Sequence, residues 1–480
     1  MDSKQKNNNS TAWIWAFTEN GLNKAIGFVV YVILAQFLTP TEFGVVALAR
    51  IVTDYMETIA DQGLGNAIIQ KKNLSNQLID AAFWMNLFIS LILFAFIFLF
   101  APSIATFYDE PRLVDVLMIL SVVIVISGLT RIQVAILIKN MRFRDLSYRS
   151  LTASLIGGVV GVFMAFNDYG VWSIVGQQVV SYTVSLMVLW KVSEWRPCFN
   201  ISLEAVKELY SFSSKVILNQ QLVFFSNKLD SIVVSTFFGL AALGIYDLAK
   251  KVILLMINVF YTPFSKILLS QYSKIQDNAD EVSKQLISTL YLSGLIIIPI
   301  FIILSALSDS FILFLFGKEW VGAQSILSIV CIYGALRIFP TLLHASFLAR
   351  GKPHYPLWSN LLRLIFLVSM IPFAIPFGLV GFGIILVISE LFGILSDFIF
   401  LKNNLKVCLR SSTYTLMDLC ISTLPIYILL KLLLEYVGSN HSDFVILFSG
   451  TVIGISAHAT FLYVFKRDSL VTMKLLFYKK

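Results

Sequence analysis

The segment VVALARIVTDYMETIADQGLGNAIIQ, residues 45–70, is apolar enough to cross a membrane and yet contains charged side chains. Four of them lie four, three and four positions apart, which places them on one stripe of an α-helix. A charge at bilayer depth costs roughly 3 kcal/mol or more, so such side chains usually face a bundle interior or a water-filled cavity. The stripe therefore indicates a polar cavity beside this helix. It consists of Arg50, Asp54, Glu57 and Asp61.

The whole chain has the composition of a membrane protein. Of its 480 residues, 58% are hydrophobic and 13% are charged, whereas soluble domains are nearer half apolar and a quarter charged. The net charge of +8 comes from basic residues that punctuate apolar segments and form no continuous basic arm, which argues against nucleic acid as a partner. The four cysteines include no CxxC pair, so we expect neither disulfides nor a metal site.

Fourteen segments are long and apolar enough to span a bilayer, for which a helix needs about 20 residues. The predicted fold class is therefore an all-α polytopic membrane protein with 14 transmembrane helices. The segments are residues 13–38, 45–70, 79–101, 113–138, 150–166, 171–191, 213–238, 244–268, 285–308, 323–348, 357–376, 379–401, 414–434 and 444–465.

Lysine and arginine are concentrated in the loops on one side of this arrangement. The loops and termini on that side hold about 25 of them, and those on the other side hold about 3. Because cytoplasmic loops carry the excess of basic residues, this bias predicts that both termini are cytoplasmic.

An internal repeat relates two halves of the chain. Residues 35–52 align without a gap to residues 235–252, so that Gly44 meets Gly244 and Arg50 meets Lys250. Two lobes of six helices each should therefore be related by an axis along the membrane normal, with a substrate site between them near the bilayer midplane. The predicted domains are an N-terminal lobe (1–192), a cytoplasmic amphipathic linker (193–212), a C-terminal lobe (213–402), and helices 13 and 14 with a cytoplasmic tail (403–480).

The linker contains apolar residues that recur at helical spacing among charges, which predicts a short helix lying on the membrane surface. They are Leu203, Val206, Leu209 and Tyr210.

Sequence motifs of enzymes are absent. The chain has no GxxxxGK[ST], HExxH or GxSxG, and its four histidines lack metal-ligand spacing. A membrane polysaccharide polymerase would need a substantial outer loop or domain, whereas the longest predicted outer connections have about 10–15 residues. We therefore expect a protein that is not an enzyme and uses no cofactor. Transport would then depend on an ion gradient, on membrane potential or on the substrate's own gradient.

Charged residues within the predicted spans have two interpretations, ion pairing and contact with a substrate or ion. Pairing is favoured where opposite charges lie one turn apart, as for Arg50 with Asp54. Cations near mid-depth or in the outer half of their helices should line a central cavity and hold an anionic polar head such as a lipid pyrophosphate carrying sugars. Arg131 and Asp61 lie toward the cytoplasmic ends, outside that cavity. The predicted cavity cations are Lys24, Arg50, Lys228, Lys250 and Arg337.

Five stretches carry a resemblance to a known family. They are LAQFLTPTEFGVVALARI (34–51), DQGLGNAIIQKKNLS (61–75), PFSKILLSQYSKIQDNADEVSKQL (263–286), FGKEWVGAQSIL (316–327) and GLVGFGIILVISELF (378–392). They resemble the polysaccharide transport family, the Wzx-type oligosaccharide flippases of the multidrug/oligosaccharidyl-lipid/polysaccharide (MOP) superfamily. The nearest resemblance is to colanic-acid-exporter-like lipopolysaccharide biosynthesis proteins.

The resemblance implies a fold and an activity. The fold would be a V-shaped bundle of two six-helix lobes in parallel repeat plus two C-terminal helices, working by alternating access. The activity would be flipping an undecaprenyl-pyrophosphate-linked oligosaccharide from the inner to the outer leaflet of a bacterial inner membrane, for O-antigen, capsule or exopolysaccharide. Its partners would be membrane lipids and the polymerase and export proteins of polysaccharide synthesis.

The resemblance also suggests roles for single residues. Lys24, Arg50 and Lys250 would hold the pyrophosphate. For three acidic residues the choice between counter-ion and site for a coupling proton or sodium ion is open. These are Asp54, Glu57 and Asp247. The alternative function is an ion-coupled drug or metabolite antiporter of the multidrug and toxin extrusion type, which should favour an acidic, aromatic-lined cavity.

Overall fold

The computed structural model describes residues 21–465, except 73, 200–201, 276–277, 406–408 and 438–441. The described residues form helices and short connections and contain no strand. Residues 13–20 of the first predicted span, and both termini with their predicted cytoplasmic location, lie outside this part. The chain divides into two compact units, Met1–Gly244 and Ile245–Lys480, which we call unit 1 and unit 2. The four-part division predicted from the sequence stays a prediction.

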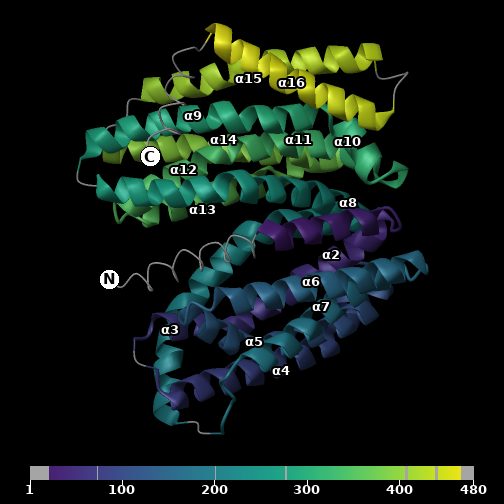
Figure 1. Cartoon of the computed structure of the whole chain (residues 1–480), viewed down its shortest axis with the longest axis vertical. Coiled ribbons are helices and arrows are strands. Elements are labelled where there is room, and N and C mark those ends of the chain that lie inside the picture. The colour runs from purple at the N-terminus through teal and green to yellow at the C-terminus, as the bar shows by residue number, and fades with distance from the viewer. Residues whose placement is uncertain are drawn as a thin grey trace. The chain divides into compact units, whose positions relative to one another are not determined.

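Unit 1 consists of antiparallel helices, in which α4 packs against α5 and α6 packs against α7 (Figure 1). Its last helix, α8, is the longest and continues into unit 2. The helices are Gly21–Ala35, α2 (Pro40–Asp61), α3 (Leu64–Gln70), α4 (Asn76–Phe107), α5 (Arg112–Lys139), α6 (Phe143–Phe166), α7 (Val171–Val192) and α8 (Leu203–Lys274).

In unit 2, α9 packs against both α11 and α15, and α13 packs against α14 (Figure 1). The elements after α8 are α9 (Ala279–Ala306), α10 (Ser308–Leu315), η1 (Lys318–Trp320), α11 (Ala323–Leu336), α12 (Ile338–Ala349), α13 (His354–Ala374), η2 (Ile375–Phe377), α14 (Gly378–Leu405), α15 (Leu409–Val437) and α16 (Asp443–Phe465).

Nine helical stretches of the described chain are long and apolar enough to cross a membrane, so the protein is a multi-pass membrane protein. Two of these stretches, Gln220–Tyr261 and His354–Lys402, contain 42 and 49 residues and each covers two predicted spans. A helix rises 1.5 Å per residue and the hydrocarbon core is about 30 Å thick, so each is longer than one crossing requires. The count of 14 spans stays a prediction.

The predicted helix 45–70 is wrong at both ends. The helix α2 begins at Pro40, because Thr39 and Glu42 form a reciprocal capping box in which the Thr39 amide donates to Glu42 Oε2 at 2.8 Å. It ends at Asp61, since the next two residues have left-handed φ angles of 43° and 73° before α3 starts. The second of these residues is Gly63, a common helix-terminating residue that the apolar pattern obscured.

Two further predicted boundaries differ from the structure. The predicted spans 213–238 and 244–268 meet at a single non-helical residue, Gly239, whose φ of 84° and ψ of 178° are accessible essentially to glycine alone. The predicted span 323–348 is divided at Arg337, where α11 ends and α12 begins.

The aligned glycines of the internal repeat lie at one helix crossing. A Cβ atom on Gly44 would lie 1.8 Å from the carbonyl oxygen of Leu240, and one on Gly244 would lie 1.9 Å from that of Pro40. Pro40 and Leu240 are themselves 200 positions apart, like the two glycines, so the contact is reciprocal. The two backbones approach this closely only because neither glycine carries a side chain.

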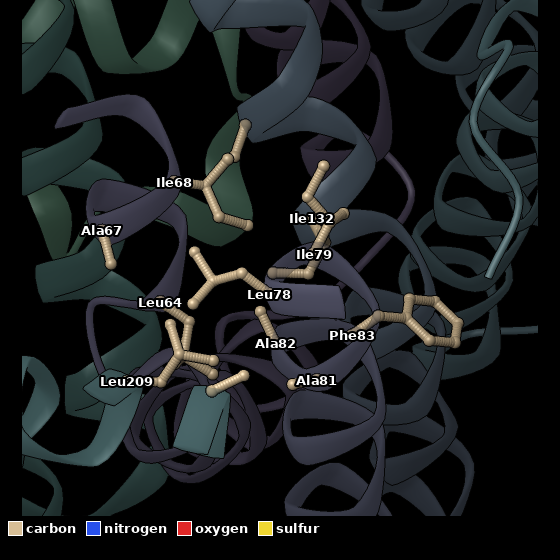
Figure 2. Close-up of a cluster of buried hydrophobic side chains, with 12 residues drawn as sticks. Leu64, Ala67, Ile68, Leu78, Ile79, Ala81, Ala82, Phe83, Ile132 and Leu209 are labelled. Carbon is tan, nitrogen blue, oxygen red and sulfur yellow. The ribbon is translucent and has the colours of Figure 1, made fainter. Parts of the chain in front are cut away.

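The start of α8 is packed into unit 1. Ala205 and Leu209 are buried in a cluster with α3, α4 and α5 (Figure 2), and Lys71 pairs with Glu208 at 2.5 Å. Of the four apolar residues predicted from the sequence, Leu209 is buried, whereas Leu203 and Tyr210 are exposed. The packed face therefore differs from the predicted one and includes Ala205.

Candidate functional site

A pocket of about 500 Å³ opens between three helices of unit 1, a size that suits a small-molecule or headgroup site. The helices α2 and α8 face each other across it, with lining residues at helical spacing, and α5 contributes an arginine. The lining residues are Asp54, Thr58 and Asp61 of α2, Arg131 of α5, and Gln220, Val223, Phe224, Asn227 and Lys228 of α8.

An ion pair joins α2 and α8 at one side of this pocket. The Lys228 ammonium lies 2.9 Å from Asp54 Oδ2, and the two side chains are 32% and 31% exposed. The sequence suggested Arg50, one turn away on α2, as the partner of Asp54; the structure supplies a partner from α8. A partly exposed pair holds less strongly than a buried one, so an anion entering the pocket can compete with Asp54 for Lys228.

A second ion pair lies two turns along α2. Arg131 Nε is 3.0 Å from Asp61 Oδ1, and Gln220 Nε2 donates to Asp61 Oδ2 at 3.4 Å. The sequence placed Arg131 and Asp61 toward the cytoplasmic ends, outside the predicted central cavity. In the structure both line this pocket of unit 1, because the first half of α8 extends alongside α2 as far as the end of α2. The side-chain oxygen of Gln220 is buried and accepts no hydrogen bond from the described residues.

The remaining charges of the α2 stripe, Arg50 and Glu57, do not line this pocket. Glu57 accepts a hydrogen bond of 3.3 Å from Ser127 Oγ on α5, and Arg50 is exposed one turn before Asp54. Lys24 is exposed on the helix Gly21–Ala35. Of the predicted site residues, the structure thus brings Asp54 and Lys228 together in the pocket of unit 1.

Aromatic rings form the apolar part of the pocket region. Phe224, which lines the pocket and is buried, has its ring centroid 5.0 Å from that of Tyr55 on α2. The neighbouring ring of Phe225 lies 5.5 Å from Tyr55. Rings at this spacing hold α2 and α8 together beside the charged groups.

The other predicted cavity residues belong to unit 2. Lys250 and Asp247 are half-buried on α8, and the Lys250 ammonium lies 5.8 Å from the centre of the Tyr246 ring, within cation–π range. Arg337 Nη1 lies 3.5 Å from Glu390 Oε1. Arg363 Nη1 lies 2.6 Å from the other oxygen of the same carboxylate, which is only 1% exposed.

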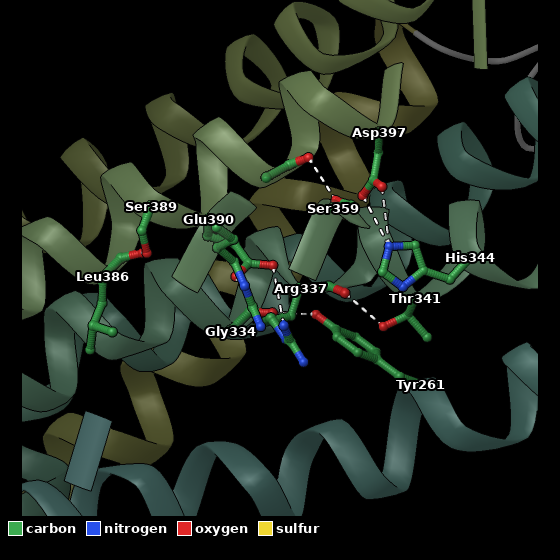
Figure 3. A network of polar contacts seen from close by, with 12 residues as sticks. Tyr261, Gly334, Arg337, Thr341, His344, Ser359, Leu386, Ser389, Glu390 and Asp397 are labelled. Carbon is green, nitrogen blue, oxygen red and sulfur yellow. Dashed lines mark hydrogen bonds and ion pairs between the residues drawn. The ribbon is translucent and has the colours of Figure 1, made fainter. Parts of the chain in front are cut away.

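A buried polar network surrounds this carboxylate (Figure 3). The Tyr261 hydroxyl donates to the Gly334 carbonyl oxygen at 2.6 Å, and His344 Nε2 lies 3.2 Å from both oxygens of Asp397. The sequence located these acids within spans without finding their partners. A signal was present, since Arg337 and His344 are seven positions apart and so are Glu390 and Asp397.

Known proteins resemble this chain over most of its length. Residues 33–325 match the family described as polysaccharide biosynthesis protein. The succinoglycan biosynthesis transport protein ExoT of Rhizobium meliloti (strain 1021) is 26% identical over 468 residues, which are 95% of this chain and 93% of that protein. The lipopolysaccharide biosynthesis protein WzxC of Escherichia coli (strain K12) is 22% identical over 340 residues, 70% of this chain and 69% of that protein.

Solved structures show the same fold. The lipid II flippase MurJ, in an inward closed conformation, superposes with a TM-score of 0.76 at 16% identity, covering 95% of this chain and all (100%) of that chain. An inward-facing multidrug resistance MATE family transporter of the MOP superfamily superposes with a TM-score of 0.55 at 17% identity, covering 82% of this chain and 99% of that chain. The family resemblance inferred from the sequence is thereby confirmed. The chain belongs to the polysaccharide biosynthesis protein family and is a multi-pass membrane protein with the fold of the MOP superfamily.

Proposed function

We propose that this protein flips a lipid-linked oligosaccharide from the inner to the outer leaflet of a bacterial inner membrane, by alternating access, for surface polysaccharide synthesis. The carrier lipid in this proposal is undecaprenyl pyrophosphate, and both termini are cytoplasmic. The relatives named for succinoglycan transport and for lipopolysaccharide biosynthesis support this substrate class. The observation that carries the proposal is the unit 1 pocket, in which two cations pair with two partly exposed carboxylates.

Exchange of ion-pair partners gives this pocket a means to bind and release a pyrophosphate. The phosphate oxygens would replace Asp54 at Lys228 and Asp61 at Arg131, since both cations are natural phosphate ligands. When the substrate leaves, each cation pairs again with its own carboxylate. Re-pairing lets the empty protein return with the charges of its pocket neutralised.

Neutral polar groups in the same pocket suit the sugars. The buried Gln220 oxygen needs a donor such as a sugar hydroxyl, and Thr58 and Asn227 also line the pocket. We propose that Lys24, Arg50, Lys250 and Arg337 contribute to the anion path. Asp54, Glu57 and Asp247 act in this proposal as counter-ions or as sites for a coupling ion.

A drug antiporter is the alternative, and the pocket fits it less well. Such a carrier needs an acidic, aromatic-lined cavity, and Phe224 does supply an aromatic wall. However, each carboxylate that lines the pocket is paired with a cation, which leaves no acidic excess for a cationic drug. The MATE transporter shares the fold, which does not by itself imply the substrate.

Replacing the pocket cations tests the proposal. In a strain that lacks the gene, Lys228→Gln and Arg131→Gln should each abolish most surface polysaccharide at matched protein levels. Lys71→Gln is the matched control, because it removes a lysine from the exposed pair with Glu208, and it should export normally. Normal export by both pocket variants would exclude this pocket as the substrate site.

A further inference from the structure

The first turns of α8 have two opposite faces. Ala205 and Leu209, four positions apart, are buried in the cluster with α3, α4 and α5 (Figure 2). Leu203, Lys207 and Tyr210 lie four and three positions apart, so they form one stripe on the other side of the helix. Leu203 and Tyr210 are 79% and 66% exposed, and Lys207 is exposed between them. We call these three residues the outer stripe of α8.

A third large apolar side chain, Phe199, is exposed shortly before α8. Its side chain is 81% exposed, and its ring centroid lies 4.5 Å from that of Trp84 on α4. The Cys198 amide donates to Asp80 Oδ1 at 3.2 Å, and Trp84 Nε1 donates to the Cys198 carbonyl oxygen at 3.0 Å. Hydrogen bonds to α4 therefore hold this part of the chain in place while the ring of Phe199 stays exposed.

The start of α8 lies at the ends of two helices that are long enough to span the membrane. Its neighbours in the buried cluster include Leu78 at the start of α4 and Ala135 near the end of α5. In Figure 1 the first turns of α8, at the lower left, run across the end of α4 and not along its axis. Because α4 has 32 residues, it is roughly 48 Å long, whereas a bilayer with its headgroups measures about 40–45 Å. The end of α4, and with it the start of α8, therefore lies at headgroup level.

The same end of unit 1 carries an excess of positive charge. Residues 71–72, 139–149 and 191–210 contain nine lysines or arginines and four aspartates or glutamates. Two of the acids already have basic partners, because Glu208 pairs with Lys71 at 2.5 Å and Glu194 pairs with Arg142 at 3.0 Å. Basic residues beside a bilayer attract anionic headgroups. The exposed basic residues of this end are Lys72, Arg144, Lys191, Arg196 and Lys207.

We propose that the outer stripe of α8, together with Phe199, docks on the headgroup region of a bilayer leaflet that contains anionic phospholipid. Leu203, Tyr210 and Phe199 enter the boundary between headgroups and acyl chains, and the Lys207 ammonium lies among the lipid phosphates. A tyrosine suits this depth, because its ring is apolar and its hydroxyl is polar. The sequence predicted a surface helix with Leu209 on its apolar face, whereas in the structure Leu209 packs into unit 1 and the outer stripe faces away from it.

Docking at this point also concerns the pocket of unit 1. The helix that begins with the outer stripe continues without a break to Gln220, Asn227 and Lys228, which line the pocket. A start of α8 that is held at the leaflet surface fixes the position from which these side chains extend. A protein partner fits the outer stripe less well than lipid, because at headgroup level it would first have to displace the lipid that surrounds the spans.

Spin labelling of the full-length protein in nanodiscs tests the docking. The four native cysteines are replaced by serine, and a single label is attached to Leu203→Cys, Tyr210→Cys or Glu204→Cys. Collisions with oxygen, which concentrates in lipid, and with a water-soluble nickel complex report the surroundings of each label. Glu204 is the matched control, because it is exposed in the same turn but lies beside the outer stripe. In nanodiscs that contain phosphatidylglycerol, the ratio of oxygen to nickel collisions should be several-fold higher at positions 203 and 210 than at position 204.

Replacing the lysine of the stripe tests the preference for anionic lipid. Nanodiscs of phosphatidylcholine alone are compared with nanodiscs that also contain phosphatidylglycerol, and the label is at position 203. Phosphatidylglycerol should raise the collision ratio in the protein with Lys207, and this increase should be smaller in Lys207→Gln. Lys318→Gln is the control, because it removes an exposed lysine from η1 of unit 2, and it should respond like the protein with both lysines.

Each contrary outcome overturns a defined part of the proposal. Equal collision ratios at positions 203, 204 and 210 would place the outer stripe in water and overturn the docking. Few collisions with either reagent at positions 203 and 210 would show that protein covers the stripe, and lipid would be the wrong occupant. A ratio that phosphatidylglycerol does not change would overturn the preference for anionic lipid. The labels report without any substrate, so these results do not depend on the proposed function.

Discussion

Two ion-paired sites, the pocket of unit 1 and the Glu390 network of unit 2, differ in how deeply their acidic side chains are buried. In the pocket of unit 1, the Asp54 and Lys228 side chains are 31% and 32% exposed. In the network of unit 2, the Glu390 side chain is 1% exposed and lies between two guanidinium groups. Water or a ligand can replace one partner of the first pair, whereas opening the second leaves a charge in a dry interior. The exposed fraction of the side chains therefore separates ion pairs that can exchange a partner for a ligand from ion pairs that stabilise the fold.

The largest effect is expected where the buried carboxylate loses its charge. Glu390→Gln keeps the side-chain volume but leaves Arg337 and Arg363 adjacent and without their shared counter-ion, which should lower the free energy of unfolding by about 3–5 kcal/mol. Thermal unfolding of the purified protein in detergent measures this loss. Glu435→Gln removes the same charge from an exposed position of α15 and should have little effect. Equal stability of the two variants would contradict the distinction between the regions.

Replacing a carboxylate by its amide in the pocket should change substrate binding more than it changes stability. Asp54→Asn removes one partner of a partly exposed pair, so the loss in unfolding free energy should stay below about 1 kcal/mol. Lys228 then lacks its carboxylate in the empty protein and should bind an anionic headgroup more tightly, with slower release and less export. Lys228→Gln should bind it more weakly. Calorimetry measures the affinity of both variants for undecaprenyl pyrophosphate, with undecaprenol as the uncharged control. If the affinity changed in the same direction in both variants, the exchange of ion-pair partners would be refuted.

The sequence predicted the class of fold, the family and the polar stripe on α2, because these depend on local apolar pattern and on motifs. It could not predict that Asp54 pairs with Lys228, because the two residues are 174 positions apart and their helices meet only through tertiary packing. For the same reason the depth of Asp61 along its own helix could not indicate that α8 makes it part of the wall of the unit 1 pocket. The pairs Arg337–Glu390 and His344–Asp397 of unit 2 did have a signal in the sequence, because the two basic residues and the two acidic residues are each seven positions apart.

A third ion pair extends the comparison to the connection between two helices, where the basic partner is half-exposed. Between α4 and α5, Arg112 Nε donates to Glu110 Oε1 at 2.7 Å and Nη2 donates to Oε2 at 3.0 Å. The arginine side chain is 52% exposed. Its hydrogen bonds hold the pKa of Glu110 below its usual range. The folded protein therefore binds this proton less readily than the unfolded chain does.

The smallest effect is expected at this pair, and it should depend on pH. The stabilisation is fully present above the unfolded glutamate pKa of about 4.3 and is lost as the pH falls toward the lower pKa of the folded state. Arg112→Gln should therefore reduce the unfolding free energy by about 0.2–1 kcal/mol at neutral pH, and the gap from the wild type should close in acid. Thermal unfolding of both proteins across this range measures the gap. If the gap stayed constant in acid, Arg112 would act through packing of its side chain, and exposure alone would not rank the three pairs.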